Sequence, residues 1–225
     1  LEKSLKYCAS LAEKGYKVFV QPMLTMRYTD DELKRLIYES NRMEAFAVYF
    51  VDSYGYMNEY DINRIYELYD QYLDPKIHIG FHAHNNLDMA FSNARHFMGM
   101  LKERNLIVDS CATGMGQGAG NLQTELIAHY MNKNFKKEYS MKSILNICDI
   151  LGKFKEDEIR MWGYSPIRFV SAIHQAAYKY AVAMKIQYNM SLSEISDILS
   201  EIPLELKYRY TEENLKKVLD VTYRR

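Results

Sequence analysis

Short apolar runs alternate with amphipathic segments through the first part of the chain. Four runs rich in β-branched and aromatic residues predict buried strands near 17–22, 46–51, 77–82 and 106–110. Apolar residues at helical spacing predict helices at 1–14, after Thr29, after Asn58, at 87–101 and at 122–131. Strands that alternate with helices at roughly 30-residue spacing are typical of βαβ units in a parallel sheet.

The strand pattern stops near residue 141. The rest of the chain predicts helices at 141–151, 166–186, 192–201 and 212–220, and Ser191 with Glu194 forms a capping box at the start of the third. Four βα units are half of a (β/α)₈ barrel, although an open, doubly wound sheet has the same rhythm.

Composition argues against several classes of protein. Of the 225 residues, 29 are Lys or Arg and 29 are Asp or Glu, so no basic stripe suggests nucleic acid or anionic lipid as a partner. No apolar run approaches the roughly 18 residues that span a bilayer. The three cysteines are Cys8, Cys111 and Cys148. Their odd number and wide spacing argue against a disulfide framework, so we expect a reducing, cytoplasmic setting.

Two histidines stand where a strand is expected to give way to a helix, in "GFHAHNNLDMA" (80–90). Alternation along a strand puts His82 and His84 on one face, with Phe81 and Ala83 on the other. Two imidazoles at the carboxyl end of a parallel strand can share a metal ion. The alternative is that one histidine packs while the other faces solvent, and for a bare His-x-His that alternative is the commoner one.

A glycine-rich loop follows the fourth predicted strand, in "DSCATGMGQGAGN" (109–121). Glycines at alternate positions let the backbone turn tightly and approach a ligand, so Gly116 and Gly118 are predicted to bind substrate. Asn121 is predicted at the N-cap of the next helix. The loop has neither G-K-[ST] nor G-x-G-x-x-G, which argues against a nucleotide site, and a plain connecting loop is the alternative.

A carboxylate closes the second predicted strand, in "YFVDSYGYMN" (49–58). A buried carboxylate is costly unless it is paired or functional, so Asp52 is a candidate substrate-binding residue. Aspartate is also common in turns and helix caps, so this signal alone is weak.

Taken in order, "FVDSYGYMN", "IGFHAHNNLDMAFSNA" and "IVDSCATGMGQGAGNLQTEL" resemble the last strands of the pyruvate-carboxyltransferase-like (HMG-CoA lyase-like) TIM barrels. The resemblance implies that His82 and His84 bind a divalent cation and that Asn121 lies at or beside it. It also implies that "WGYSPIRFVSA" (162–172) follows the barrel and supplies Tyr164 for proton transfer. The predicted fold is therefore an α/β partial TIM barrel of about four C-terminal βα units at 1–140, followed by a helical region at 141–225.

Within this family the sequence is most similar to the 4-hydroxy-2-oxovalerate aldolases. That similarity implies a metal-dependent lyase that cleaves a 4-hydroxy-2-oxo acid to pyruvate and an aldehyde, with Mn²⁺ or Mg²⁺ as cofactor and Zn²⁺ as an alternative. The lyase that acts on a coenzyme A ester carries a cysteine in its glycine loop, and "GMGQGAGN" has none. A Claisen-type synthase joining an acyl-CoA to a 2-oxo acid, or a non-catalytic assembly module, are the rival interpretations.

The family's R-D-G motif on the first barrel strand has no counterpart in this sequence. We therefore expect a C-terminal half-barrel that needs a missing N-terminal half, is inactive by itself, and self-associates as a homo-oligomer through its open strand edges.

Overall fold

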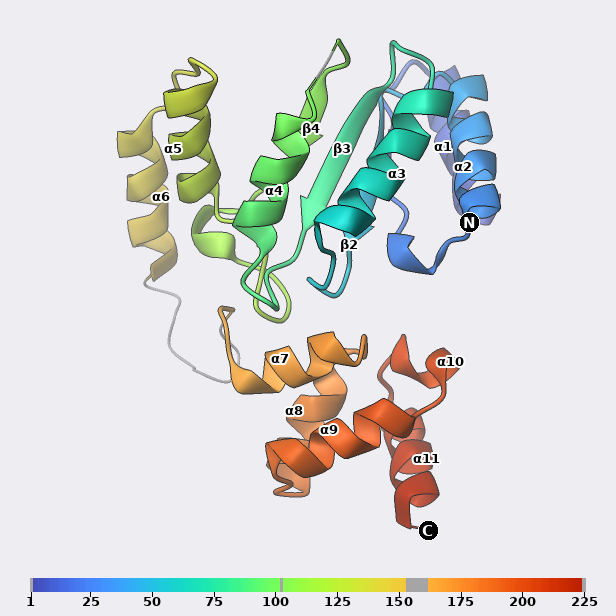
Figure 1. Ribbon diagram of the computed structural model, residues 1–225, viewed down its shortest axis with the longest axis vertical. Helices are drawn as coiled ribbons and strands as arrows, with labels where there is room; N and C mark the ends of the chain where they lie inside the picture. Colours follow the sequence, from blue (N-terminus) through green and yellow to red (C-terminus); the bar gives the residue numbers. More distant parts are fainter. Residues whose placement is uncertain (1, 102, 153–161, 224–225) are drawn as a thin grey trace.

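The computed structural model describes residues 2–101, 103–152 and 162–223, and it has two parts (Figure 1). A parallel sheet with helices around it forms one part, and the strands point toward a group of helices that forms the other. The elements of the first part are α1 (Glu2–Glu13), β1 (Phe19–Val20), η1 (Thr25–Arg27), α2 (Asp30–Arg42), β2 (Ala47–Asp52), α3 (Glu59–Tyr72), β3 (His78–Ala83), α4 (Ala90–Gly99), β4 (Leu106–Val108), η2 (Ala112–Gly114), α5 (Thr124–Asn134) and α6 (Met141–Gly152).

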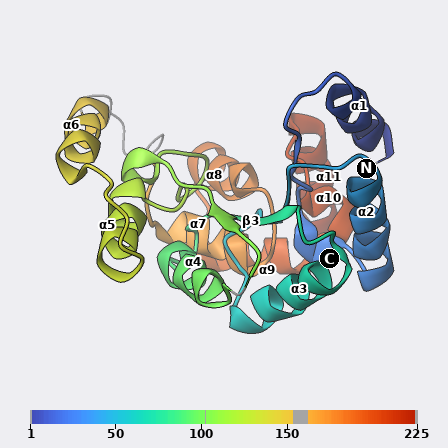
Figure 2. The same ribbon diagram turned by 90° about the horizontal axis from the view of Figure 1, so that it is seen from above.

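The four strands form one parallel sheet in the order β1-β2-β3-β4. The register pairs Val51 with His82 and Phe81 with Val108, so the carboxyl ends of β2, β3 and β4 lie at the same end of the sheet. In Figure 2 the helices α2, α3, α4 and α5 follow an arc along one side of the sheet. The predicted parallel α/β fold is confirmed, and the arrangement is consistent with a partial TIM-barrel-like domain.

The first hydrophobic core lies between the sheet and its helices. Phe50, Phe81 and Phe97 are buried at its centre, with ring centroids of Phe50 4.8 Å from Phe81 and 5.3 Å from Phe97. Each of these rings contributes roughly 1.5–3 kcal/mol by leaving water. Capping boxes at Thr29 and Asn58 fix the starts of α2 and α3, the two helices that the sequence predicts after these residues.

The second part contains α7 (Pro166–Ile173), α8 (Tyr178–Gln187), α9 (Leu192–Glu201), α10 (Leu204–Lys207) and α11 (Glu212–Tyr223). These helices enclose a separate hydrophobic core around Tyr180, Met184, Ile195 and Leu215. The helix α6 packs on α5 and does not join this second core. No helix among the described residues is both long and apolar enough to cross a membrane.

Three helix boundaries differ from the prediction. The predicted helix at 166–186 is two helices, because Gln175 adopts the left-handed φ of 49° between them. The helix predicted from residue 87 begins at Ala90, and Asp88 just before it has φ 59°. Asn121 is not a helix N-cap: it forms a bridge with His84, and the N-cap position of α5 is Gln123, whose side chain makes no capping hydrogen bond. The loop backbone there pairs with the end of β3, which keeps it extended.

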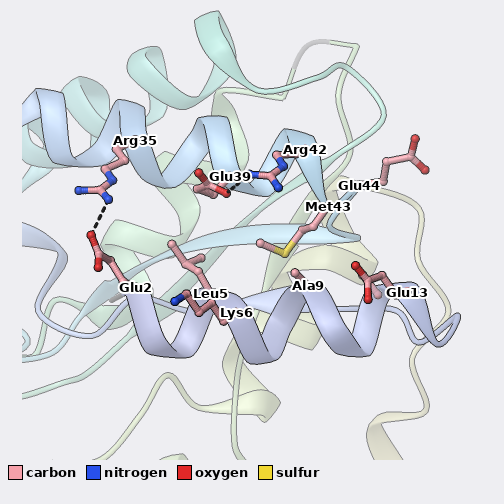
Figure 3. Close-up of a pocket in the computed structure, with 11 residues that line it drawn as sticks. Glu2, Leu5, Lys6, Ala9, Glu13, Arg35, Glu39, Arg42, Met43 and Glu44 are labelled. Atoms are coloured by element: carbon pink, nitrogen blue, oxygen red, sulfur yellow. Dashed lines mark hydrogen bonds and ion pairs between the residues drawn. The ribbon is translucent and has the colours of Figure 1, made fainter.

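A groove of about 590 Å³ runs between α1 and α2 on the outside of the sheet (Figure 3). Charged side chains line it, and two ion pairs, Arg35 with Glu2 and Arg42 with Glu39, hold several of them. The groove lies on the outer helices and not at the carboxyl ends of the strands, where parallel sheets carry their chemistry.

Candidate metal and substrate site

The strand β3 delivers both histidines to one face. Phe81 and Ala83 are buried in the core, at 0% and 1% exposure, while His82 and His84 are half-buried on the other face. The centroids of the two imidazole rings lie 5.0 Å apart. The alternation inferred from the sequence therefore places the two side chains close enough to share a ligand.

Both rings are oriented by acceptors. Nδ1 of His82 lies 3.0 Å from Oδ2 of Asp109, and Nδ1 of His84 lies 2.8 Å from the backbone oxygen of Asp52. A carboxylate and a carbonyl can only accept, so each Nδ1 carries the proton and each Nε2 keeps a free lone pair. Burial, above all, lowers the pKa of His84 and favours its neutral, ligating form.

Asp109, at the end of β4, was not among the residues singled out from the sequence. Its carboxylate accepts hydrogen bonds from His82, from the hydroxyl of Tyr49 at 3.0 Å and from the amide of Gln21 at 3.1 Å. Burial by itself would raise the pKa of Asp109, but these hydrogen bonds outweigh it and hold the pKa below its ordinary value. The sequence does contain a sign of this role, because Asp109 directly follows the strand that pairs with β3, next to His82.

Asn121 follows the glycine loop, and its backbone pairs with that of His84, although Asn121 is not among the described residues that line the cleft with the histidines. Its amide nitrogen donates to the backbone oxygen of Met115 at 2.8 Å, while its Oδ1 is buried with no hydrogen-bond partner. A Cβ on Gly116 would stand 2.4 Å from Nδ2 of Asn121, so only glycine leaves room for this side chain. Oδ1 is therefore a buried oxygen whose lone pairs are free to coordinate a cation.

The second glycine predicted to bind substrate, Gly118, lines the cleft in front of the histidines. It has φ of +64°, and a Cβ there would meet Oδ1 of Asn86 at 2.8 Å. Oδ1 of Asn86 accepts the backbone N–H of Ala119 at 2.8 Å. Both predicted glycines thus allow an asparagine to pack against the loop, and their contact with substrate stays a prediction.

Asp52 is 2% exposed, and its carboxylate accepts the backbone N–H groups of Tyr56 at 2.8 Å and Met57 at 3.1 Å. Burial raises its pKa to about 7. The side chain holds the loop after β2 and contributes to the site through its backbone oxygen, which accepts from His84. This geometry favours a structural role over the predicted contact with substrate.

An open cleft of about 590 Å³ is lined by both histidines, by residues at the strand ends and by residues of the second part. The sheet side supplies Gln21, Ser53, Tyr54, His82, His84 and Asn86, and the helical side supplies Tyr178, Lys179, Tyr208, Arg209 and Tyr210. Sequence reasoning missed the helical wall, because no local pattern indicates which distant helix packs over a strand end.

Tyr164 does not line this cleft, and it is 57% exposed. The residues just before it dock on the glycine loop instead. The indole N–H of Trp162 donates to the backbone oxygen of Thr113, and the backbone N–H of Gly163 donates to that of Ala119. The predicted catalytic role of Tyr164 stays a prediction.

The donors present fit a divalent cation as a partial set. Nε2 of His82 and Nε2 of His84 share one face, and Oδ1 of Asn121, next to His84 through the backbone pairing, would complete a mixed imidazole and oxygen set of the kind that manganese, magnesium and zinc accept. Across the described ranges, no group of three or more His, Cys, Asp or Glu side chains is arranged to hold a metal ion. Further ligands would have to come from water or substrate.

Comparison with known families decides the assignment of the first part of the chain. The HMGL-like family profile matches residues 1–152. The chain belongs to the HMGL-like family. The match covers the whole sheet with its helices and all of His82, His84 and Asn121, and it ends with α6.

Curated relatives of this HMGL-like chain include 4-hydroxy-2-oxovalerate aldolases. The one from Carboxydothermus hydrogenoformans is 27% identical over 203 residues, which cover 84% of this chain and 55% of the relative. The one from Thermomicrobium roseum is 43% identical over 89 residues, 40% of this chain and 24% of the relative. The aligned regions thus span from about a quarter to about half of these relatives' lengths.

Solved structures show the same fold. The carboxyl transferase domain of pyruvate carboxylase from Rhizobium etli, solved with oxamate and biotin, superposes with a TM-score of 0.69 at 10% identity, over 99% of this chain and 40% of that one. Hydroxymethylglutaryl-CoA lyase from Pseudomonas aeruginosa superposes with a TM-score of 0.55 at 18% identity, over 67% of this chain and 56% of that one.

Proposed function

We propose that this chain carries the metal-binding strand of a divalent-metal-dependent aldolase that cleaves a 4-hydroxy-2-oxo acid to pyruvate and an aldehyde. The observation that supports it most directly is that His82 and His84 lie side by side at the carboxyl end of a parallel sheet, with ring centroids 5.0 Å apart, and that the backbone of Asn121 pairs with His84. The family and the names of the curated relatives point to the same chemistry.

In this proposal His82, His84 and Asn121 hold the cation, which supplies positive charge to offset the negative charge that develops on the substrate oxygens as the C–C bond breaks. Asp109 keeps the proton of His82 on Nδ1 and so keeps Nε2 available. The tyrosines of the helical wall exclude water from one side of the cleft.

The proposal includes further strands that pair with β1 and β4, the two edges of the described sheet. Unpaired edges expose backbone N–H and C=O groups that favour association with another chain or another copy. We expect the 225-residue chain by itself to form oligomers and to have little aldolase activity. Light scattering coupled to size-exclusion chromatography measures the first, and pyruvate release from 4-hydroxy-2-oxovalerate measures the second.

Metal binding is the direct test. We expect the chain to bind Mn²⁺, measured as the loss of the free Mn²⁺ signal in electron paramagnetic resonance, and we expect His82→Ala and His84→Ala to lose that binding. His129→Ala, on α5, serves as the matched control. Equal Mn²⁺ binding by all four proteins would refute the proposed site.

A further inference from the structure

The helical wall of the cleft is positively charged. Lys179 lies at the start of α8 and Arg209 lies between α10 and α11, and both line the same cleft as His82 and His84. Of the described residues that line this cleft, none is an aspartate or a glutamate. Nor does either side chain form an ion pair within the described parts of the chain. The wall therefore presents two uncompensated positive charges to whatever occupies the cleft.

A third cation, Arg27, lies on the sheet side of the cleft, in a small gap that it lines together with Ser53 and Tyr54. Arg27, in η1, stacks over the ring of Tyr54 with its Cζ 5.7 Å from the centroid. Its Nε and Nη2 are buried without a hydrogen-bond partner, and so is the hydroxyl of Tyr54. Lys207, on α10, is close enough that the positive charge of Arg27 lowers its pKa, in addition to the larger effect of burial.

Arg27 and Lys207 are half-buried, so each has lost part of its hydration, whereas Lys179 and Arg209 are exposed. Removing charged groups from water costs several kcal/mol per ion in real proteins, and like charges repel each other. The small gap beside Arg27 is also lined by Ser53, Tyr54 and the carboxylate-bearing Asp52. In the cleft itself no carboxylate of the described residues lines the wall beside Lys179 and Arg209, so an anionic ligand would meet both charges unpaired.

The size of the cleft agrees with a ligand longer than a small oxo acid. Its volume of about 590 Å³ lies in the range, about 300–1,000 Å³, of pockets that enclose drug-sized molecules. If the oxo-acid end of a substrate lies at His82 and His84, then the remainder of the molecule extends toward Lys179 and Arg209.

We propose that Lys179 and Arg209 form a subsite for a second anionic group, a carboxylate or a phosphate, at the far end of the substrate. The substrate class is then a 2-oxo acid with a negatively charged terminus, and the released aldehyde carries that charge. This inference rests on the proposed function for the position of the oxo-acid end, while the anion subsite itself needs neither metal nor turnover.

The test uses the metal-free chain and three probes that share a carboxylate with a three-carbon chain: butyrate, glutarate and 4-phosphonobutyrate. Butyrate has one charged end, whereas the other two have a second anionic group. Isothermal titration calorimetry at low ionic strength measures their affinities for the wild-type chain and for the double variant Lys179→Gln/Arg209→Gln. The matched control, Arg95→Gln/Lys216→Gln, also removes two exposed positive charges, but neither residue lines the cleft.

We expect at least one of the doubly charged probes to bind the wild type about tenfold or more tightly than butyrate, because hydrogen bonds to charged groups typically contribute that much. The tighter of the two identifies the group as carboxylate or phosphate. The cleft variant loses this preference and the control keeps it. Equal affinity for all three probes, or an equal loss in both variants, would overturn the subsite.

The two affected side chains are exposed, so the cleft variant is expected to fold, and its far-ultraviolet circular dichroism verifies this. The single variants Lys179→Gln and Arg209→Gln provide the same comparison if the double variant does not. Because no probe carries a 2-oxo group and no metal is present, a chain that fails the Mn²⁺ test can still pass this one, and the reverse also holds.

Discussion

Asp109→Asn is the sharpest probe of the proposed metal site, and we expect it to weaken Mn²⁺ binding by about 10–100-fold. The change replaces one carboxylate oxygen with an NH₂ group. The carboxylate accepts three hydrogen bonds, from Nδ1 of His82 at 3.0 Å, from Tyr49 at 3.0 Å and from Gln21 at 3.1 Å. An amide offers one oxygen acceptor, so it cannot satisfy all three donors.

The cost falls on His82. If the amide oxygen remains with Tyr49, the NH₂ group faces Nδ1 of His82, and two N–H donors cannot face each other. The ring then moves its proton to Nε2, the atom that would bind the metal. To bind the metal, His82 must return its proton to Nδ1, and this N–H then faces the NH₂ group of the asparagine with neither group hydrogen-bonded. Leaving these groups unsatisfied costs about 1–3 kcal/mol. A factor of 10–100 in affinity corresponds to about 1.4–2.7 kcal/mol, so the two estimates agree.

The assay is a Mn²⁺ titration followed by electron paramagnetic resonance, with Asp220→Asn as the control. Asp220 is an exposed residue on α11, and its replacement removes the same charge away from the cleft. Urea unfolding checks that both variants fold. Equal Mn²⁺ affinity in Asp109→Asn and Asp220→Asn would refute the proposed link between Asp109 and His82.

Three further outcomes are expected for stability. Burial raises the pKa of Asp52 from 3.8 to about 7, so the free energy of unfolding should fall by about 4 kcal/mol as pH rises from about 4 to 7, at 1.36 kcal/mol per pKa unit. Asp52→Asn should remove this pH dependence in urea unfolding, and parallel pH dependences in the two proteins would contradict the prediction. Gly80→Ala places a Cβ 2.4 Å from the Tyr49 ring and should cost about 1–3 kcal/mol, so an unchanged urea midpoint would count against this packing. Ser191→Ala removes the capping box with Glu194 and should lower stability by about 1 kcal/mol, whereas a neutral result would assign the start of α9 to packing alone.

The sheet could be read from the sequence because its strands are short apolar runs buried on both faces. All six residues of β2 are buried, and the five that precede Asp52 form the continuous apolar run that strands covered on both faces require. The first strand is shorter than predicted: only Phe19 and Val20 pair with β2, at residues 47 and 48. The helix ends were harder, because Asn121 pairs with the end of β3 and neither partner's local sequence shows that contact.

The candidate site divides in the same way. The shared face of His82 and His84 follows from strand alternation, which is a local property. Asp109 could have been found by asking which strand neighbours β3. Lys179 and Arg209 could not, because they reach the cleft only through the packing of the helical part, which is determined by contacts between distant segments.

The sheet and the helical part have separate hydrophobic cores, with the cleft between them. Substitutions inside one core therefore leave the packing of the other intact. Mutation of the helical wall can alter which molecule is selected without disturbing the strand that would carry the metal. Under the proposed function, the strand ends would determine reactivity and the helical wall would determine which substrate is selected, so exchanging the helical part between relatives should change specificity and leave the metal-binding strand intact.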